Sequence, residues 1–280
     1  MSYFVARLSG GSASAVATDR VIQRYGRRRV WIRFEDTGFE DEDTYRFVND
    51  LMARWGGRLL VGNPGRTPLD VFEAKSIIPN SAVAPCSREL KIVPFEAWLW
   101  RVPKPVTIVS GLGWNEPHRI NRILRYHKHA GVWRAPMGFA RRIPGVYEDF
   151  PLLWKPLEYR PYAEVVRSWG IEPPRAYRLG FPHNNCGGRC VRQGIAEWKR
   201  LWFVWPERFA QMRDWEAANR AKGGARADMS FCRTRVGGDS QSITLAELER
   251  QFQRETCGAL PLLEYADDRS ACYCEAMEVA

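Results

Sequence analysis

Short apolar runs recur along the first 110 residues, separated by stretches of helical periodicity. Four runs have the length and composition of buried strands: residues 3–8, 30–34, 58–61 and 106–109. Apolar positions four residues apart predict an amphipathic helix over 14–25. A second helix is predicted over 40–55, because four acidic residues in its first turn suit the positive end of a helix dipole.

This alternation of strands and helices is typical of a parallel sheet. We expect an α/β fold, with a doubly wound, mostly parallel five-stranded sheet and helices on both faces, in a first domain over residues 1–150. A mainly helical, cysteine-containing region is predicted over 151–280. Its expected helices are 162–169, 194–221 with a break at Pro206, and 244–256 with a capping box of Thr244 and Glu247; residues 222–226 are expected to be a flexible loop.

Composition and charge narrow the class of protein. The chain has 280 residues, 45% of them apolar, and a net charge of +10. These values are typical of a folded globular protein. The apolar runs are far shorter than a membrane span, and the first residues lack the basic and apolar regions of a secretory signal. We therefore expect a cytoplasmic protein with no membrane partner.

Basic residues are concentrated between positions 117 and 147, where the chain has no acidic residue. Seven basic side chains lie there: Arg119, Arg122, Arg125, Lys128, Arg134, Arg141 and Arg142. A solvated surface and a polyanion-binding surface both fit this pattern. The second interpretation predicts a nucleic-acid substrate, tRNA or DNA, whose binding weakens as salt rises.

The seven cysteines are an odd number in a chain without an export signal, which favours metal binding or thiol chemistry over a disulfide framework. Cys186 and Cys190 flank two glycines in a turn-rich loop. Three interpretations remain open for this pair: core packing, a metal or iron–sulfur site, and a catalytic thiol. Cys232 and Cys257 have apolar neighbours and are predicted core residues.

Residues 9–14, with the sequence SGGSAS, lie between the first strand and the first helix. In open α/β sheets ligands bind at the carboxyl ends of the strands. Two glycines allow close backbone approach, and the helix N-terminus supplies unpaired N–H groups and positive potential. The segment therefore predicts phosphate binding, although it is not a Walker-type loop.

Four motifs occur in order along the chain: SGG at 9–11, DTGFE at 36–40, CSRELKIVPF at 86–95 and GLGWNEPHR at 111–119. With them the chain resembles, over roughly residues 1–200, the PAPS reductase-like branch of the PP-loop ATP pyrophosphatase superfamily. The resemblance implies an enzyme that uses an adenine nucleotide, ATP or PAPS, with Mg²⁺. It also fits a bacterial or phage source.

The resemblance also implies roles for individual residues. Phosphate contacts fall on Ser9, Gly10, Gly11, Ser12 and Ser14, and nucleoside contacts on Asp36, Thr37 and Gly111. Catalytic roles fall on Ser9, Ser14, Glu116 and Arg119. Relatives that thiolate nucleic acids hold a 4Fe–4S cluster with scattered cysteines, and the corresponding candidates are Cys86, Cys186, Cys190, Cys272 and Cys274.

Two departures from the family pattern bear on the reaction. Ala13 stands where the family has an aspartate, and the Cys272–Cys274 tail lacks the ECGLH-type segment of true PAPS reductases. We therefore expect adenylylation of a substrate, with pyrophosphate release, in a sulfur-transfer or nucleic-acid thio-modification pathway that involves a sulfur-donor protein. The alternatives are a PAPS or adenylyl-sulfate reductase and a non-catalytic, metal-stabilised nucleic-acid-binding module.

Overall fold

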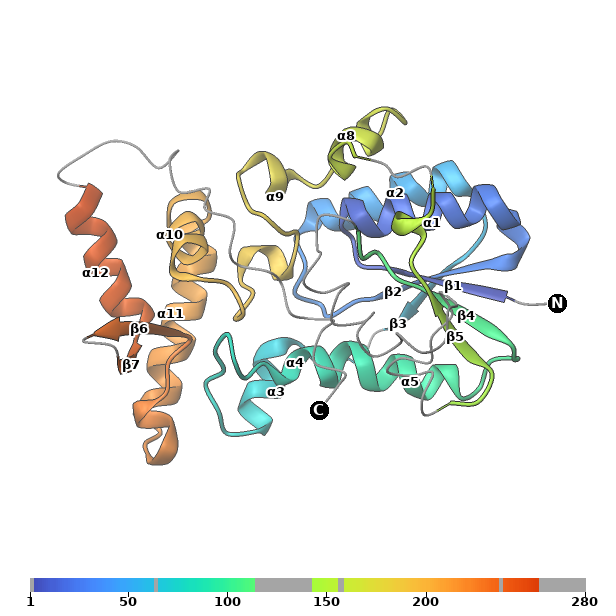
Figure 1. Ribbon diagram of the computed structural model, residues 1–280. Coiled ribbons are helices and arrows are strands. Elements are labelled where there is room, and N and C mark those ends of the chain that lie inside the picture. Colours follow the sequence, from blue (N-terminus) through green and yellow to red (C-terminus); the bar gives the residue numbers. More distant parts are fainter. Residues whose placement is uncertain (1–2, 63–64, 114–142, 156–158, 237–238, 257–280) are drawn as a thin grey trace.

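The computed structural model describes residues 3–62, 65–113, 143–155, 159–236 and 239–256 (Figure 1). Within these residues the chain has an α/β fold built on a five-stranded, all-parallel sheet. The strand order is β3-β2-β1-β4-β5. The strands are β1 (Tyr3–Leu8), β2 (Val30–Glu35), β3 (Leu59–Gly62), β4 (Val106–Val109) and β5 (Val146–Asp149).

The four strand ranges expected from the apolar runs are confirmed to within one residue at each end. The position of β5 was not predicted, because it contains no apolar run: Val146 is buried, Tyr147 is 40% exposed, and the two residues that follow are acidic. Since β5 pairs only with β4 at the edge of the sheet, it needs no continuous apolar run.

Helices cover the sheet on both faces (Figure 1). On one face lie α1 (Ser12–Tyr25) and α2 (Glu42–Trp55), and on the other α3 (Pro68–Ala74), α4 (Pro85–Ser87) and α5 (Val93–Leu99). A short π-helical segment, Arg88–Ile92, links α4 to α5.

Two helix starts differ from the prediction. The first helix begins at Ser12 instead of residue 14, with Gly11 as its N-cap, and α2 begins at Glu42 instead of residue 40, with Asp41 as its N-cap. Glu40 and Asp41 therefore lie before α2, and their carboxylates accept hydrogen bonds from Cys186 and Arg175 in the C-terminal part.

The C-terminal part contains α8 (Tyr162–Arg167), α9 (Arg175–Arg178), α10 (Ile195–Val204), α11 (Pro206–Ala221), the hairpin β6 (Cys232–Val236) and β7 (Asp239–Ile243), and α12 (Leu245–Thr256). Its helices α10, α11 and α12 lie beyond the carboxyl ends of the strands, whereas α8 lies over α1 and α2 (Figure 1). The predicted break at Pro206 is confirmed, as is the capping box, in which Thr244 and Glu247 exchange backbone-to-side-chain hydrogen bonds. The predicted loop over 222–226 is wrong in part, because Gly224–Asp228 forms a 3₁₀ turn.

Apolar clusters join residues from both sides of position 150. Leu152 and Val165 belong to the cluster that packs α1 and α2 on the sheet. Phe72 of α3 shares a second cluster with Trp198 and Phe209. Residues after position 150 thus pack both on the layer of α1 and α2 and against α3. No helix in the described ranges is both long and apolar enough to cross a membrane.

Glu216 of α11 joins the hairpin and α12 to the helical part. Its carboxylate accepts hydrogen bonds from the Phe231 N–H at 2.8 Å and the Leu245 N–H at 2.6 Å. The side chain is 1% exposed. Burial outweighs the two N–H donors and raises the pKa of Glu216 to about 7.

Glu216→Ala is expected to lower the free energy of unfolding by about 2–4 kcal/mol, since two buried N–H groups lose their acceptor.

The folded state binds the Glu216 proton more tightly than the unfolded chain, whose glutamates titrate near 4.5. The contribution of this carboxyl to stability is therefore full below that value and falls as pH rises through about 7. Urea unfolding at about pH 5 and about pH 8 should show a smaller loss at the higher pH. Exposed Glu207 on the same helix is the control, and an equal loss in Glu207→Ala would contradict the assignment.

Candidate functional site

The Ser9–Ser14 loop follows β1 at its carboxyl end, and its last three residues form the start of α1. Gly10 has φ +79°, a conformation that residues with a Cβ rarely adopt. A Cβ at this position would also lie 2.5 Å from Thr44 Cγ2. Glycine at position 10 is therefore required for the loop to turn against the start of α2.

Hydroxyl groups hold the shape of this loop. The Ser14 hydroxyl accepts hydrogen bonds from the Ser9 N–H at 3.1 Å and the Ser9 hydroxyl at 3.0 Å. It donates to the Gly11 carbonyl at 2.8 Å. Ser14 is buried and Ser9 is exposed, so Ser14 braces the loop while Ser9 lies at its surface.

The ends of β2 and β4 lie beside the loop, as the order of parallel strands predicts. A Cβ on Gly111, just after β4, would lie 3.0 Å from the Ser14 backbone. After β2, Asp36 Oδ1 accepts hydrogen bonds from the Gly38 N–H and the Tyr45 hydroxyl, both at 2.8 Å. Burial and this carboxylate raise the pKa of Tyr45, which keeps its hydroxyl a donor.

The contact of Thr37 with a nucleoside stays a prediction, and the side chain itself is bound within the turn after β2. It is 2% exposed, and its hydroxyl donates to Glu40 Oε1 at 3.2 Å. In this arrangement the Thr37 side chain stabilises the turn after β2 and presents little surface to a ligand.

Two residues that the sequence analysis did not assign reach the loop from the C-terminal part. The Tyr177 hydroxyl accepts a hydrogen bond from the Ser12 N–H at 3.3 Å. Asn184 Nδ2 donates to the Gly10 carbonyl and to Thr44 Oγ1, both at 2.9 Å. Asn184 lies in the turn-rich loop that was singled out for its cysteines, so its sequence position was a usable signal.

Polar atoms at this loop are buried without hydrogen-bond partners among the described residues. They are the hydroxyl of Ser12 and Oδ1 of Asn184. Both side chains are only 4% exposed. Buried polar atoms are nearly always paired, so these two atoms mark a place where a ligand or water completes the site.

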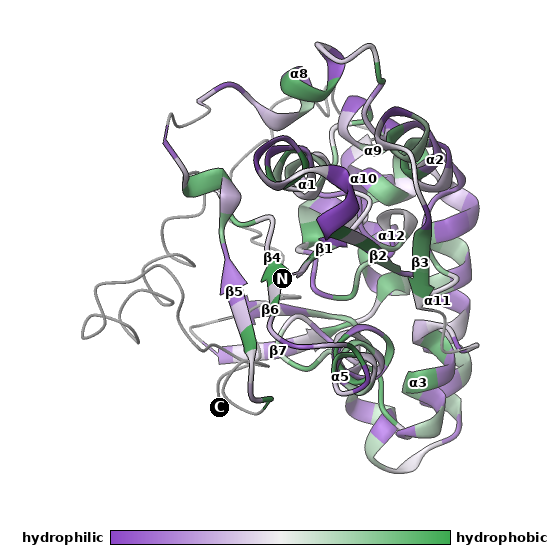
Figure 2. Cartoon of the chain, turned by 90° about the vertical axis from the view of Figure 1, so that its right-hand side faces the viewer, coloured by the Kyte–Doolittle hydropathy of each residue, from purple (hydrophilic) through white to green (hydrophobic). Residues whose placement is uncertain are grey.

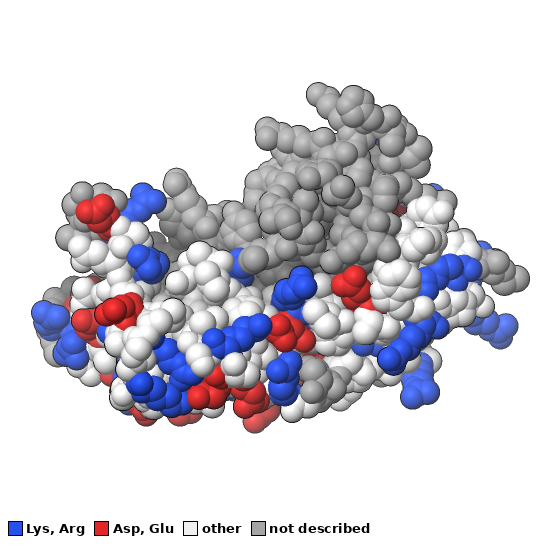
Figure 3. Space-filling model, turned by 90° about the horizontal axis from the view of Figure 1, so that it is seen from below, with Lys and Arg blue, Asp and Glu red and all other residues white. Residues whose placement is uncertain are grey.

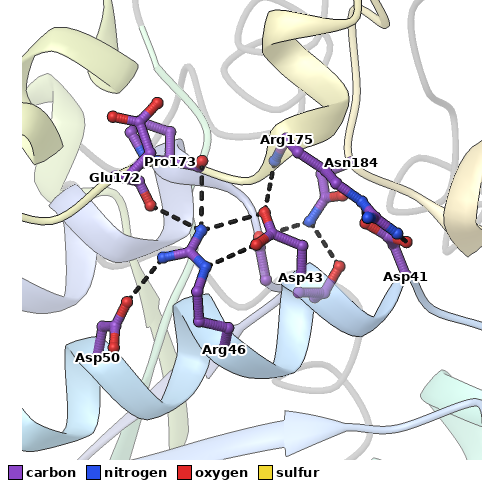
Figure 4. Close-up of polar contacts among 10 residues, drawn as sticks. Asp41, Asp43, Arg46, Asp50, Glu172, Pro173, Arg175 and Asn184 are labelled. Atoms are coloured by element: carbon purple, nitrogen blue, oxygen red, sulfur yellow. Dashed lines mark hydrogen bonds and ion pairs between the residues drawn. The ribbon is translucent and has the colours of Figure 1, made fainter.

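Asp41, immediately before α2, forms ion pairs with two arginines, and Figure 4 shows it next to one of them, Arg175. Asp41 is completely buried, and its carboxylate binds the guanidinium groups of Arg175, at 2.6 and 2.7 Å, and Arg208, at 2.7 Å. Burial alone would raise the pKa of Asp41, but the two arginines outweigh it and lower the pKa. Asp43 adds a second anchor by accepting the Arg175 N–H at 2.6 Å.

The cysteine loop is bound to the turn after β2. The Cys186 N–H donates to Glu40 Oε2 at 2.9 Å. Arg189 donates to the Phe39 carbonyl at 3.0 Å, and its guanidinium lies 3.7 Å from the centre of the Phe39 ring. The CxxxC segment is therefore positioned by the same turn that carries Asp36.

Three of the five predicted metal-ligand cysteines line one pocket: Cys86, Cys186 and Cys190. They carry thiols and form no disulfide. Thr37 and Lys91 line the same pocket. In the described ranges, however, no three His, Cys, Asp or Glu side chains are grouped closely enough to hold a metal ion. The described residues alone therefore do not form a metal site, and no reaction step is assigned to one.

Several predicted residues lie outside the described ranges: Glu116, Arg119, Cys257, Cys272, Cys274 and most of the basic stretch, residues 117–142. Ala13 is partly buried and packs against the apolar cluster beneath α1, so position 13 supplies no ligand for Mg²⁺. Cys232 is confirmed as a core residue at 4% exposure.

The chain was also compared with known proteins. No protein-family model matches it, and no curated protein matches it either. The interpretation of the site therefore depends on its own geometry and on the motifs in the sequence.

Proposed function

We propose that the Ser9–Ser14 loop binds the phosphates of an adenine nucleotide and that the protein uses ATP to adenylylate a substrate, releasing pyrophosphate. The pathway would be sulfur transfer or nucleic-acid thio-modification. The observation that carries the proposal is the buried Ser12 hydroxyl at the N-terminus of α1, which has no hydrogen-bond partner within the part of the chain that the structure describes. A phosphate oxygen would supply its missing partner.

The chemistry of the loop fits a polyphosphate. The N-terminus of a 14-residue helix presents backbone N–H groups and positive potential to an anion. The Ser12 N–H, now bonded to the Tyr177 hydroxyl, is available to a phosphate once that hydroxyl moves. Asp36, half-buried beside the loop, is placed to accept a hydrogen bond from a ribose hydroxyl.

The proposed reaction makes one bond and breaks one. A substrate oxygen attacks the α-phosphorus of ATP, and the bond from that phosphorus to the pyrophosphate oxygen breaks. The charge that develops on the leaving pyrophosphate would be stabilised by the N-terminus of α1. With Ala13 in place of a carboxylate, Mg²⁺ would be held mainly by the phosphates and water.

A reductase remains the second candidate because three thiols line a pocket that also includes Thr37, next to the proposed nucleoside site. Reduction of an adenylyl sulfate consumes two thiols per sulfite released. The third candidate, a non-catalytic binding module, is favoured by Ala13 alone.

A product assay distinguishes the three candidates. Purified protein is incubated with ATP, PAPS and adenylyl sulfate in turn, with Mg²⁺ and a thiol reductant, and pyrophosphate and sulfite are measured. We expect pyrophosphate from ATP, increased by the correct acceptor substrate. Sulfite from either sulfated nucleotide would instead identify a reductase, and the absence of both products despite nucleotide binding would identify the binding module.

Ser12→Ala separates ligand binding from folding. The Ser12 hydroxyl has no hydrogen-bond partner among the described residues, so its removal should not lower the melting temperature. A hydroxyl bonded to a charged phosphate contributes about 1.5–3 kcal/mol, so ATP affinity measured by calorimetry should fall by about 10- to 100-fold. Exposed Ser81 provides the matched control, Ser81→Ala. Unchanged ATP affinity in Ser12→Ala would remove the phosphate assignment.

Iron content tests the cluster that the family resemblance implies. Protein purified without oxygen should contain iron and absorb broadly near about 400 nm, as thiolate-bound clusters do. Cys186→Ala should lose both signals, whereas Cys232→Ala, which removes a core cysteine outside the pocket, should keep them. Colourless protein without iron or zinc would leave the three pocket cysteines as thiols.

A further inference from the structure

The amino-terminal end of the sheet carries a shallow groove far from the nucleotide loop. Its lining includes Arg27, Arg28 and Arg58, with Trp31, Leu60 and Trp98 between them. We call it the arginine groove. Figure 2 looks onto this end of the molecule. The groove combines cationic side chains with aromatic surface.

Charge in and around the arginine groove has one sign. The three segments that supply its lining, 27–31, 57–60 and 98–102, contain five arginines and no acidic residue. Arg28, Arg29, Arg58 and Arg101 are exposed. Seen from below in Figure 3, Lys and Arg side chains gather toward this right-hand end, whereas both signs alternate on the left. Such a surface attracts an anionic partner.

The Arg27 side chain is bound to the backbone that lines the groove and does not extend into solvent. Its guanidinium donates to the Gly56 carbonyl at 2.9 Å and to the Val30 carbonyl. It packs so closely on the backbone that a Cβ at Gly57 would lie 2.5 Å from Nη2. Nη2 is buried. A cation thus lines the groove, and its Nη2 amino group has no acceptor among the described residues.

The aromatic side chains contact one another at the rim of an apolar cluster, and Trp31 and Trp98 are each partly exposed. Trp31 stacks on Tyr3 with ring centres 4.9 Å apart and meets Trp98 edge to face at 6.0 Å. Trp100 nearby is 55% exposed. Proteins bind single-stranded nucleic acids with aromatic rings, which stack on unpaired bases, and with arginines, which pair with the phosphates between the bases.

We propose that the arginine groove binds a single-stranded nucleic acid. Phosphodiester groups would pair with Arg28, Arg58 and their exposed neighbours, and unpaired bases would pack on the tryptophan floor. A duplex would satisfy the arginines but hide the base faces, so the apolar floor favours a single strand. An acidic peptide would pair with the arginines, but it lacks planar groups that alternate regularly with its charges and could pack on the tryptophans.

This binding surface is separate from the proposed nucleotide site. The strands run from the arginine groove toward the Ser9–Ser14 loop, and six-residue β1 spans roughly 20 Å. A nucleic acid bound in the arginine groove would therefore lie at a distance from the Ser9–Ser14 loop. The inference does not depend on the nucleotide chemistry, and either proposal can fail alone.

The test compares two double charge reversals by fluorescence anisotropy with a labelled 20-nucleotide single strand, as DNA and as RNA. Arg28→Glu/Arg58→Glu changes the groove, and neither side chain has a hydrogen bond or ion pair to other described residues. Arg235→Glu/Arg250→Glu changes exposed arginines of the C-terminal part by the same net charge.

We expect the groove variant to bind the single strand at least about tenfold more weakly. The slope of the logarithm of its binding constant against the logarithm of the salt concentration should fall in magnitude by about 1.4, or 0.7 for each lost phosphate contact.

The control variant should bind as the wild type does, and a duplex or an abasic strand of equal length should bind more weakly than the intact single strand. Both variants should keep the melting temperature of the wild type and its ATP affinity. Equal losses in the two variants would show general charge attraction and overturn the proposal. Binding to anionic lipid vesicles without oligonucleotide binding would also overturn it, as would equal affinity for duplex and single strand.

Discussion

The candidate site depends on one buried carboxylate, that of Asp41. A fully buried carboxylate is stable only when cations and donors replace its water, and here both cations come from the C-terminal part, more than 130 residues away in sequence. This pairing holds α9 and α11 against the carboxyl edge of the sheet. Breaking a buried pair typically costs about 3–5 kcal/mol, so the docking is strongly specified.

The consequences of that docking reach the phosphate loop. Tyr177 and Asn184 follow Arg175 along the chain and are brought to the Ser12 N–H and the Gly10 carbonyl. Asn184 and the cysteine loop are one continuous segment. The Ser9–Ser14 loop and the thiol pocket are thereby linked through a few residues, an arrangement that would suit the proposed use of a nucleotide next to thiols.

The polarity of a parallel sheet also separates two kinds of anion recognition. At the carboxyl ends of the strands, recognition would use backbone N–H groups and the α1 dipole, with few charged side chains. At the amino-terminal ends, recognition in the arginine groove would use guanidinium groups and aromatic rings. The first arrangement suits a compact phosphate group, and the second an extended polymer.

By itself the sequence determined the parallel α/β sheet, four of its strands, the positions of α1, α2 and α12, and the glycine-containing turn between β1 and α1, because these depend on local periodicity, caps and glycines. It did not locate edge strand β5, nor Tyr177 and Asn184 as parts of the site. The sequence predicted Asp41 in the first turn of a helix, and it did not show that this carboxylate pairs with Arg175 and Arg208. These features come from contacts between residues far apart in the chain, and only the tertiary structure could decide them, since burial and pairing of a side chain depend on what packs against it.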